Sequence, residues 1–460
     1  MTMTTSADIN NSATYQLANA PIPKLLRSYA IPAVVATMVN SLYNIVDRMF
    51  IGHGVDSLAI SGLAITFPIL IFLQAFGLLI GVGAASRISI LLGQKEHEKA
   101  ENLLGNAFVL SVLLSVSTIA LCMIFLDPLL RSFGASDVTL PYAREYLEIA
   151  LPGNIFANLC FAYNSVMRAS GYPTKAMKTM ILGAVLNTIL DFVFIFIFDM
   201  GIRGAAAATV IAMFVGMCYV MSHFLQQDSL VKLKSRYFKL KKEYVIAIVS
   251  IGMAPFAVQF SSSIVSVIFN KVIYTHGGDY GMGAYGIQNS YGMLIVMLML
   301  GVSQGMQPIV GFNYGAGQID RMKEAFWRSS RANLIIGLVG VALALLIPEV
   351  IAKAFTDDPK MIDISADALR LVMWALWGVG FQVSATQFFQ SIGHAKKSVF
   401  LSISRHAFFL VPILLILPNY IGLTGVWLCF PIADVGAATL SSILIYRFMK
   451  RLPTTPTPEI

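Results

Sequence analysis

Twelve apolar stretches constrain what this chain of 460 residues can fold into. A helix needs about 20 residues to cross about 30 Å of hydrocarbon. Charged residues make up only 12% of the chain, against about 25% in an ordinary soluble protein. We therefore expect an all-α membrane protein whose twelve transmembrane helices lie near 25–51, 58–91, 104–126, 139–167, 174–198, 203–225, 245–274, 282–311, 326–352, 363–390, 398–418 and 420–446.

Basic residues are confined to alternate connections between these stretches. The connections after the fourth, sixth and eighth stretches carry several Lys and Arg, whereas HGVDS, THGGD and LPNYIG carry none. The positive-inside rule then places both termini in the cytoplasm, and the net charge of +8 is no sign of nucleic-acid binding. The N-terminus lacks the basic start and apolar core of a signal peptide, so we expect a mostly disordered tail there.

The two halves of the chain resemble each other. IPAVVATMVNSLYNIVDRMFI (31–51) aligns with APFAVQFSSSIVSVIFNKVIY (254–274), so that Pro32 falls on Pro255 and Asp47 on Asn270. SGYPTKA (170–176) aligns with IGHAKKS (392–398), and MGIRG (200–204) aligns with IGLTG (421–425), at nearly the same offset in numbering. Such near-equal offsets indicate duplication of a six-helix unit, and transport pathways commonly lie between such repeats.

This duplication divides the chain into two pseudo-symmetric six-helix lobes. We expect a cytoplasmic tail at 1–22, an N-lobe at 23–226, a basic cytoplasmic linker at 227–243, a C-lobe at 244–448 and a C-terminal tail at 449–460.

Four side chains with oxygen atoms lie at similar depth in three helices of the first half. Asp47 is in the first helix, Asn187 and Asp191 are one turn apart in the fifth, and Thr209 is in the sixth. The rise of about 1.5 Å per residue puts them roughly 8 to 18 Å below the outer surface. The repeat replaces these four residues with Asn270, Phe409, Ile413 and Phe430.

This difference between the halves favours a proton or cation site, with Na⁺ as one candidate ion, over the alternative of a polar cluster that only fixes helix packing. Two nearby carboxylates in a low dielectric cannot both stay ionised without a counter-charge. A proton or a hard cation with oxygen ligands neutralises such a pair, which then titrates as one unit.

Motifs for other chemistry are absent from the sequence. It has no GxxxxGK[ST] phosphate loop and no HExxH. The six histidines are scattered and the four cysteines lie inside apolar runs, so no metal-ligand spacing is present. We expect neither an enzyme nor a bound cofactor, only a coupling ion, H⁺ or Na⁺.

Three further sets of residues have weaker signals. Arg405 and Asp434 lie at similar depth and are expected to form a structural ion pair, while Pro32 is a candidate hinge in the helix of Asp47. Amides and aromatics could line a substrate cavity or only bond neighbouring helices. These residues are Asn40, Tyr43, Asn44, Phe67, Gln259, Gln288, Tyr291 and Gln307.

Four segments resemble the multidrug and toxic compound extrusion (MATE) family over about residues 20–448. They are NSLYNIVDRMFIGHGVDSLAISGLA, MRASGYPTKAM, LNTILDFVFIF and GVSQGMQPIVGFNYGAGQIDRMKEAF. The resemblance implies a MATE-type twelve-helix efflux antiporter. It also implies that Asp47, Asn187, Asp191 and Thr209 form the N-lobe cation site, and that Pro32 is where the first helix bends. Helices 7 and 10 have Gln and Ser where the NorM-like branch has acids, so the chain is more similar to the DinF-like or MepA-like branch.

The sequence therefore predicts a secondary active multidrug efflux antiporter in the cytoplasmic (inner) membrane of a prokaryote. We expect it to work as a monomer by alternating access, exchanging organic cations and toxic amphiphiles for H⁺ or Na⁺. Its expected partners are these small molecules and the lipid bilayer, not nucleic acid. A flippase for a lipid-linked saccharide or lipid is the alternative, although the segments expected at a cavity are poor in Lys and Arg. An intramembrane enzyme using the aspartate pair is a further alternative, which no HExxH motif or phosphate loop supports.

Overall fold

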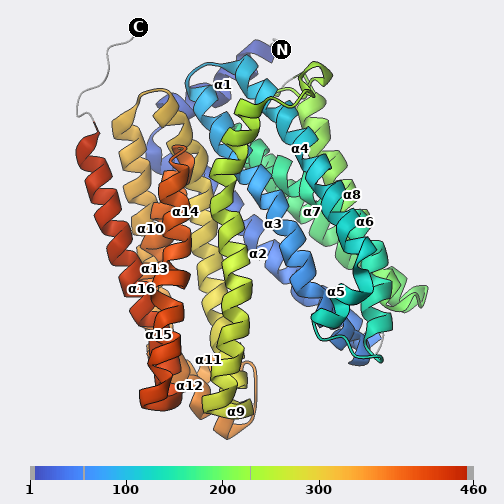
Figure 1. The fold of residues 1–460 in the computed structure, drawn as a ribbon. Coiled ribbons are helices and arrows are strands. Elements are labelled where there is room, and N and C mark those ends of the chain that lie inside the picture. Colours follow the sequence, from blue (N-terminus) through green and yellow to red (C-terminus); the bar gives the residue numbers. More distant parts are fainter. Residues whose placement is uncertain (1–5, 55–56, 228, 453–460) are drawn as a thin grey trace. The chain divides into compact units, whose positions relative to one another are not determined.

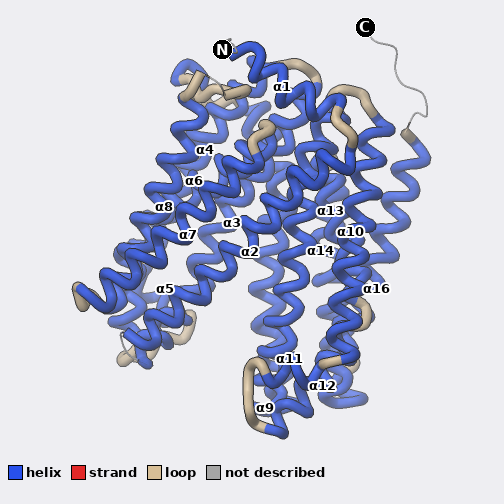
Figure 2. Tube along the Cα trace, turned by 180° about the vertical axis from the view of Figure 1, so that it is seen from behind, coloured by secondary structure: helices blue, strands red, loops and turns tan. Residues whose placement is uncertain are grey.

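The computed structural model describes residues 6–54, 57–227 and 229–452, and every regular element in these ranges is a helix (Figures 1 and 2). The described chain divides into two compact units. Unit 1 comprises residues up to Ala20 together with Val35–Phe256, and unit 2 comprises Pro21–Val34 together with the chain from Ala257 onward.

Unit 1 contains most of the first-half helices. They are α1 (Ser6–Asn19), the second part of α2 (Ile22–Gly54), α3 (Ser57–Gly93), α4 (His97–Ile124), α5 (Leu126–Ser132), α6 (Leu140–Ala169), α7 (Pro173–Phe192), the π-helix η1 (Val193–Ile197), α8 (Gly201–Leu225), the 3-10 helix η2 (Ser235–Tyr237) and the start of α9 (Lys242–Gly315). Here α6 packs against α3, α4, α7 and α8 and so forms the centre of the unit.

Unit 2 contains the first part of α2 and the remaining helices. They are the rest of α9, α10 (Ile319–Leu346), α11 (Pro348–Lys353), α12 (Pro359–Met373), α13 (Leu376–Ser391), α14 (Ala395–Ser404), the π-helix η3 (Arg405–Leu410), α15 (Val411–Ile416) and α16 (Pro418–Arg451). The α10–α13–α16 packing here corresponds to α4–α6–α8 in unit 1.

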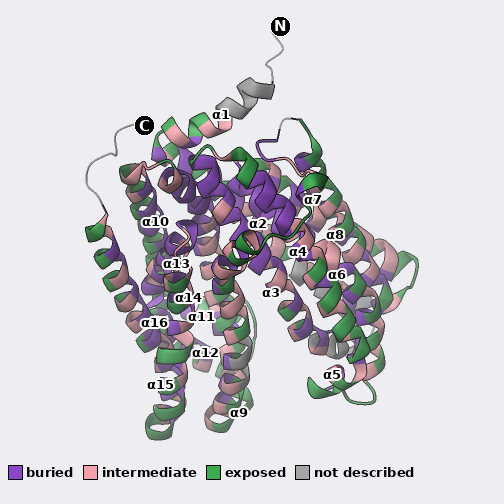
Figure 3. Cartoon of the chain, turned by 45° about the horizontal axis from the view of Figure 1, so that its top comes forward, coloured by how far each residue is buried: buried purple, intermediate pink, exposed green. Residues whose placement is uncertain are grey.

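The chain is a twelve-helix membrane protein, as its apolar stretches predict. Among the described residues ten helices are long and apolar enough to cross a membrane, and α12 with α13, bent by 49°, makes an eleventh. The remaining span is α6, whose 30 residues include several buried asparagines. Large apolar side chains stay exposed, for example Ile124 at 74% and Leu346 at 78%, which fits contact with lipid (Figure 3).

The backbone repeats its unusual conformations in the two halves. Gly171 has φ +103°, and its equivalent in the second repeat, Gly393, has φ +77°. Gly201 (φ +57°) and Gly422 (φ +61°) form a second pair of equivalent positions. Residues with a side chain rarely adopt positive φ, so the same turns end the same helices in both repeats.

The boundaries of the units differ from the lobes expected at 23–226 and 244–448. The chain leaves unit 2 between Val34 and Val35 and leaves unit 1 between Phe256 and Ala257. Both points lie close to a repeat-related proline, Pro32 or Pro255. The first part of α2 thus packs with the second repeat, and the first part of α9 packs with the first repeat.

Glycines explain why these helix segments pack where they do. A Cβ added at Gly252 would lie 1.7 Å from the carbonyl oxygen of Leu79, so α9 and α3 touch through their backbones in unit 1. A Cβ at Gly305 would lie 2.5 Å from the Cα of Ala30 in unit 2. Close backbone approach at small residues is a main source of helix association in membranes. Hydropathy carries no signal for such backbone contact. The sequence therefore predicted that the first part of α2 lies in the N-lobe and the first part of α9 in the C-lobe.

We expect Gly252→Ala to destabilise the protein because the new methyl group collides with backbone that cannot rotate away. Overpacking of this kind costs about 1–3 kcal/mol, and thermal unfolding in detergent would show a lowered midpoint. Gly286→Ala, in the part of α9 beyond the break at Gly278, is the control, because a Cβ there meets nothing within 4 Å. Equal midpoints for the two variants would contradict the packing argument.

The N-terminal segment is more ordered than expected, and the basic linker after α8 has specific contacts with α4. Residues Ser6–Asn19 of the expected tail form α1, and Leu17 is fully buried, so its apolar contact holds a helix that polar composition alone did not indicate. The basic linker lies against α4, since Lys234 Nζ is 2.6 Å from Glu101 Oε2. The backbone N–H of Lys241 also donates to Asn106 Oδ1 at 2.7 Å.

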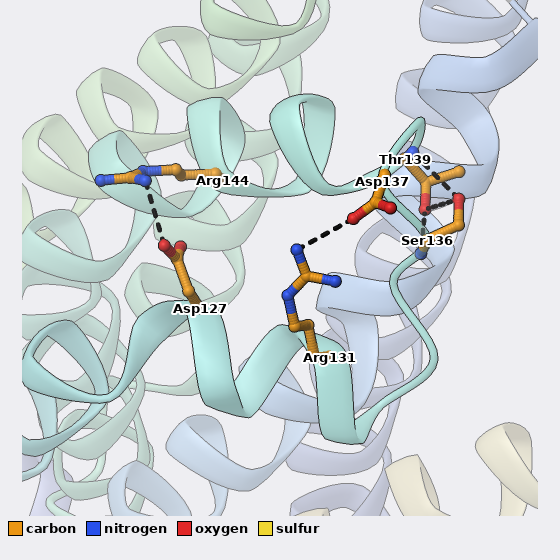
Figure 4. Close-up of polar contacts among 6 residues, drawn as sticks. All are labelled: Asp127, Arg131, Ser136, Asp137, Thr139 and Arg144. Carbon is orange, nitrogen blue, oxygen red and sulfur yellow. Dashed lines mark hydrogen bonds and ion pairs between the residues drawn. The ribbon is translucent and has the colours of Figure 1, made fainter.

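The connection from α4 to α6 was not expected to contain a helix such as α5. Arg131 bonds Asp137 at 2.9 Å and Arg144 bonds Asp127 at 3.1 Å (Figure 4). These pairs are exposed and contribute little stability, typically up to about 1 kcal/mol each. The burial of Leu130 therefore holds α5 in place more than its ion pairs do.

Candidate functional site

The four oxygen-bearing residues of the first half lie together inside unit 1. Asn187 and Asp191 are one turn apart on α7 and are 2% and 0% exposed. The Asp191 carboxyl group lies close enough to the Asp47 carboxyl group for their charges to interact. Asn187 Nδ2 is 3.3 Å from Thr209 Oγ1 on α8.

Several oxygens of this cluster have no donor. In the described part of the chain, no hydrogen-bond donor reaches Oδ1 of Asn187 or either carboxyl oxygen of Asp191. Burying an ionised carboxylate without a partner costs far more than burying a neutral group. The arrangement is therefore suited to a positive species, either a proton shared between the carboxyl groups or a cation bound by carboxyl and amide oxygens.

Tyr146 is a member of the cluster that the sequence analysis missed. It lies on α6, is 4% exposed and has its hydroxyl close enough to Thr209 to interact with it. Asp47 and Asp191 are also close enough to affect its hydroxyl electrostatically. A tyrosine in an apolar helix usually suggests an interfacial anchor. A comparison of the two repeats could have indicated Tyr146, because the equivalent residue of the second half is Ala368 and the hydroxyl is therefore particular to the first half.

A small cavity of about 20 Å³ adjoins the cluster. Asn40, Tyr43, Asn187 and Thr209 supply its polar wall, and Gly183 is part of its apolar wall. A cavity of this size holds about one water-sized particle. The site therefore offers space on the scale of an ion or a water molecule, not of a drug.

The eight residues expected at a substrate cavity fall into both units. Asn40, Tyr43, Asn44 and Phe67 belong to unit 1, and Gln259, Gln288, Tyr291 and Gln307 belong to unit 2. Phe67 is exposed, Gln259 is half-buried and Gln307 is buried. The side chain of Asn44 lies outside the described part of the structure.

Gln288 lines a second, larger cavity inside unit 2, with a volume of about 260 Å³. By contrast, the Tyr291 hydroxyl donates to the Gly340 carbonyl at 2.6 Å and so joins two helices. The geometry of Tyr291 therefore favours a bond between neighbouring helices over a place in the wall of a substrate cavity.

Arg405 and Asp434 form an ion pair within unit 2. Arg405 Nε donates to Asp434 Oδ1 at 2.6 Å, and the two side chains are 25% and 5% exposed. Pro32 is buried within α2, shortly before the point where the chain passes into unit 1. That position is suited to a bend, because proline removes a backbone hydrogen bond from the helix.

Comparison with known proteins identifies what this chain is similar to. A family model described as MatE matches residues 32–193 and 252–416. Multidrug export protein MepA of Staphylococcus aureus (strain NCTC 8325 / PS 47) is 27% identical over 448 residues, covering 97% of this chain and 98% of that protein. The MepA of Staphylococcus haemolyticus (strain JCSC1435) is 26% identical over 431 residues, covering 93% of this chain and 94% of that protein.

Solved structures give the same result. One is described as the outward-facing conformation of a multidrug resistance MATE family transporter of the MOP superfamily. It has a TM-score of 0.90 and 27% identity, covering 96% of this chain and 98% of that chain. A crystal structure of MATE in the bent conformation also has a TM-score of 0.90, with 26% identity, covering 95% of this chain and 97% of that chain.

Proposed function

Because the chain belongs to the MatE family, we propose that it is a multidrug efflux antiporter that exchanges organic cations and toxic amphiphiles for H⁺ or Na⁺. The observation that carries this proposal is the proximity of the Asp47 and Asp191 carboxyl groups in a buried cluster where the oxygens of Asp191 and Asn187 have no hydrogen-bond donor among the described residues. The names of its relatives, multidrug export protein and multidrug resistance transporter, support the substrate class. In this proposal the protein is a transporter and not an enzyme.

The coupling step in this proposal begins when a cation enters from outside and neutralises the aspartate pair. Neutralisation removes the electrostatic repulsion between the two carboxylates. This repulsion is stronger in a low dielectric than in water. The helix carrying Asp47 then rearranges near Pro32, the cavity alternates its access, and the drug leaves. The change of packing partner close to Pro32 supports this position for the bend.

We place the protein in the inner membrane of a prokaryote, with both termini in the cytoplasm and one chain as the working unit. The basic residues of the connection after α8 support this orientation through the positive-inside rule. Bacterial relatives support the membrane assignment.

The test is efflux of ethidium, a cationic dye, from proteoliposomes in which the pH gradient and the Na⁺ gradient are imposed separately. The proposal expects efflux with at least one of these gradients and none without either. Transport that proceeds equally without any ion gradient would refute antiport.

We expect Tyr146→Phe to weaken ion coupling without unfolding the protein. The hydroxyl interacts with Thr209, Asp47 and Asp191, and the loss of a polar interaction worth about 1 kcal/mol should shift the ion concentration for half-maximal efflux about fivefold. Tyr163→Phe on the same helix is the control, because that hydroxyl donates to the Leu104 carbonyl at 2.9 Å. Tyr163→Phe should lower stability and leave the ion dependence of efflux unchanged. If efflux depends on ion concentration in the same way in both variants, Tyr146 is not part of the site.

A further inference from the structure

The larger cavity in unit 2, of about 260 Å³, is the repeat-related counterpart of the small cavity in unit 1. In unit 1, Gly183, Ala184 and Met213 line the small cavity beside the aspartate cluster. The equivalent positions of the second repeat are Arg405, His406 and Asp434, and all three line the larger cavity. Each repeat therefore has an internal pocket at the same place, and charged residues line the pocket of the second repeat where small or apolar residues line that of the first.

Several polar groups in the wall of the larger cavity lack a hydrogen-bond partner among the described residues. Arg405 Nε bonds Asp434, but among the described residues no hydrogen-bond acceptor reaches either Nη group, and the Arg405 side chain is 25% exposed. Gln288 is only 4% exposed, and its Oε1 has no donor in the described part of the chain. Nδ1 of His406 likewise has no hydrogen-bond partner among the described residues. Unmet buried polar atoms like these indicate a polar occupant.

Part of the cavity wall is aromatic. Phe269 stacks on Tyr285 with ring centroids 5.3 Å apart and planes at 17°, and Phe430 lies 4.6 Å from Phe269. Stacked rings favour a flat apolar body by offset or edge-to-face contact. A volume of about 260 Å³ is close to the lower end of ligand pockets, about 300 Å³, and admits a single substituted ring.

We propose that this cavity binds a small aromatic carboxylate, with its charged group on Arg405 and its ring against Phe269 and Tyr285. The guanidinium group suits a carboxylate because its N–H donors form a fork that can make two parallel bonds. Asp434 holds this fork in place and is itself nearly inaccessible, at 5% exposure, so it offers little to a cation. This site extends the proposed function and does not depend on the aspartate pair of unit 1.

Charge balance links this binding to protons. The titratable groups on the cavity wall are Arg405, Asp434, His406 and Tyr285. With neutral imidazole and phenol groups the empty cavity has no net charge, so an added anion would leave one uncompensated negative charge in a low dielectric. The imidazole of His406 can restore neutrality by taking up one proton when the anion binds. Affinity for the anion should therefore fall by up to about tenfold for each unit of rising pH.

The test is calorimetric titration of the purified full-length protein with benzoate, benzamide and benzylamine, which share a ring and differ in charge. We expect benzoate to bind at least about tenfold more tightly than the other two, and more weakly as the pH rises. The double substitution Arg405→Gln with Asp434→Asn keeps a neutral hydrogen-bonding pair and should abolish the preference for benzoate. His406→Gln should remove the pH dependence.

Equal affinity for benzoate and benzamide, or unchanged benzoate binding in the double variant, would overturn the proposal. A pH dependence that survives His406→Gln would overturn the proton linkage. Asp47→Asn with Asp191→Asn is the matched control from the other repeat. It should bind benzoate as the wild type does while losing ion-driven efflux, so failure of this site and failure of the antiport proposal can be told apart.

Discussion

Asp191→Asn is expected to reduce gradient-driven efflux to the level of liposomes without protein, and Asp47→Asn should do the same. Asparagine fills the space of aspartate but can neither release a proton nor neutralise a cation. A single carboxylate beside an amide attracts a proton or cation less strongly than two neighbouring carboxylates do. The site then loses the ion whose movement supplies energy, about 2.3 kcal/mol for one charge at 100 mV.

Both variants should be measured in proteoliposomes with an imposed pH gradient and, separately, an imposed Na⁺ gradient. Asp127→Asn is the matched control, because this aspartate of unit 1 is exposed and pairs with Arg144 outside the cluster. It should transport at the wild-type rate. Wild-type efflux in either cluster variant would show that the buried carboxyl group is structural only.

Asp434→Asn should destabilise the protein strongly, because it leaves the Arg405 charge without its partner inside unit 2. Removing one member of a buried ion pair costs about 3–5 kcal/mol. The measurement is thermal unfolding in detergent, where we expect a large drop in the midpoint. Adding Arg405→Gln should recover most of the loss, since no uncompensated charge then remains.

Glu148→Gln is the control for this second prediction. Glu148 pairs with Arg144 at 2.8 Å, but both side chains are exposed, at 41% and 51%, and such a pair contributes at most about 1 kcal/mol. Equal losses in Glu148→Gln and Asp434→Asn would mean that burial of the Arg405–Asp434 pair has no energetic consequence.

The sequence predicted the features that depend on composition and spacing along the chain. Apolar length predicted the helices, and the repeat offsets predicted that the same turns recur, which Gly171 and Gly393 now show in the backbone. Spacing of one turn also placed Asn187 and Asp191 on one face of α7, where the structure has them. These signals are local, so no knowledge of the packing was needed.

Features that depend on contacts between distant segments could not be predicted in the same way. The packing of the first parts of α2 and α9 depends on backbone contact at glycines such as Gly252, which looks like any glycine in an apolar helix. The π-helices η1 and η3 and the bend between α12 and α13 likewise leave no hydropathy signal. Tyr146 was missed because its partners come from three other helices.

The central claim is that one buried pocket, shared by Asp47 and Asp191, holds an inorganic cation that substrate binding expels. The most direct measurement is the number of protons and Na⁺ ions released when the purified protein binds ethidium, with proton release measured by calorimetry in buffers of different ionisation enthalpy. The account predicts release of about one cation per dye from the wild type and none from Asp47→Asn or Asp191→Asn. Equal release from the wild type and both variants would contradict it.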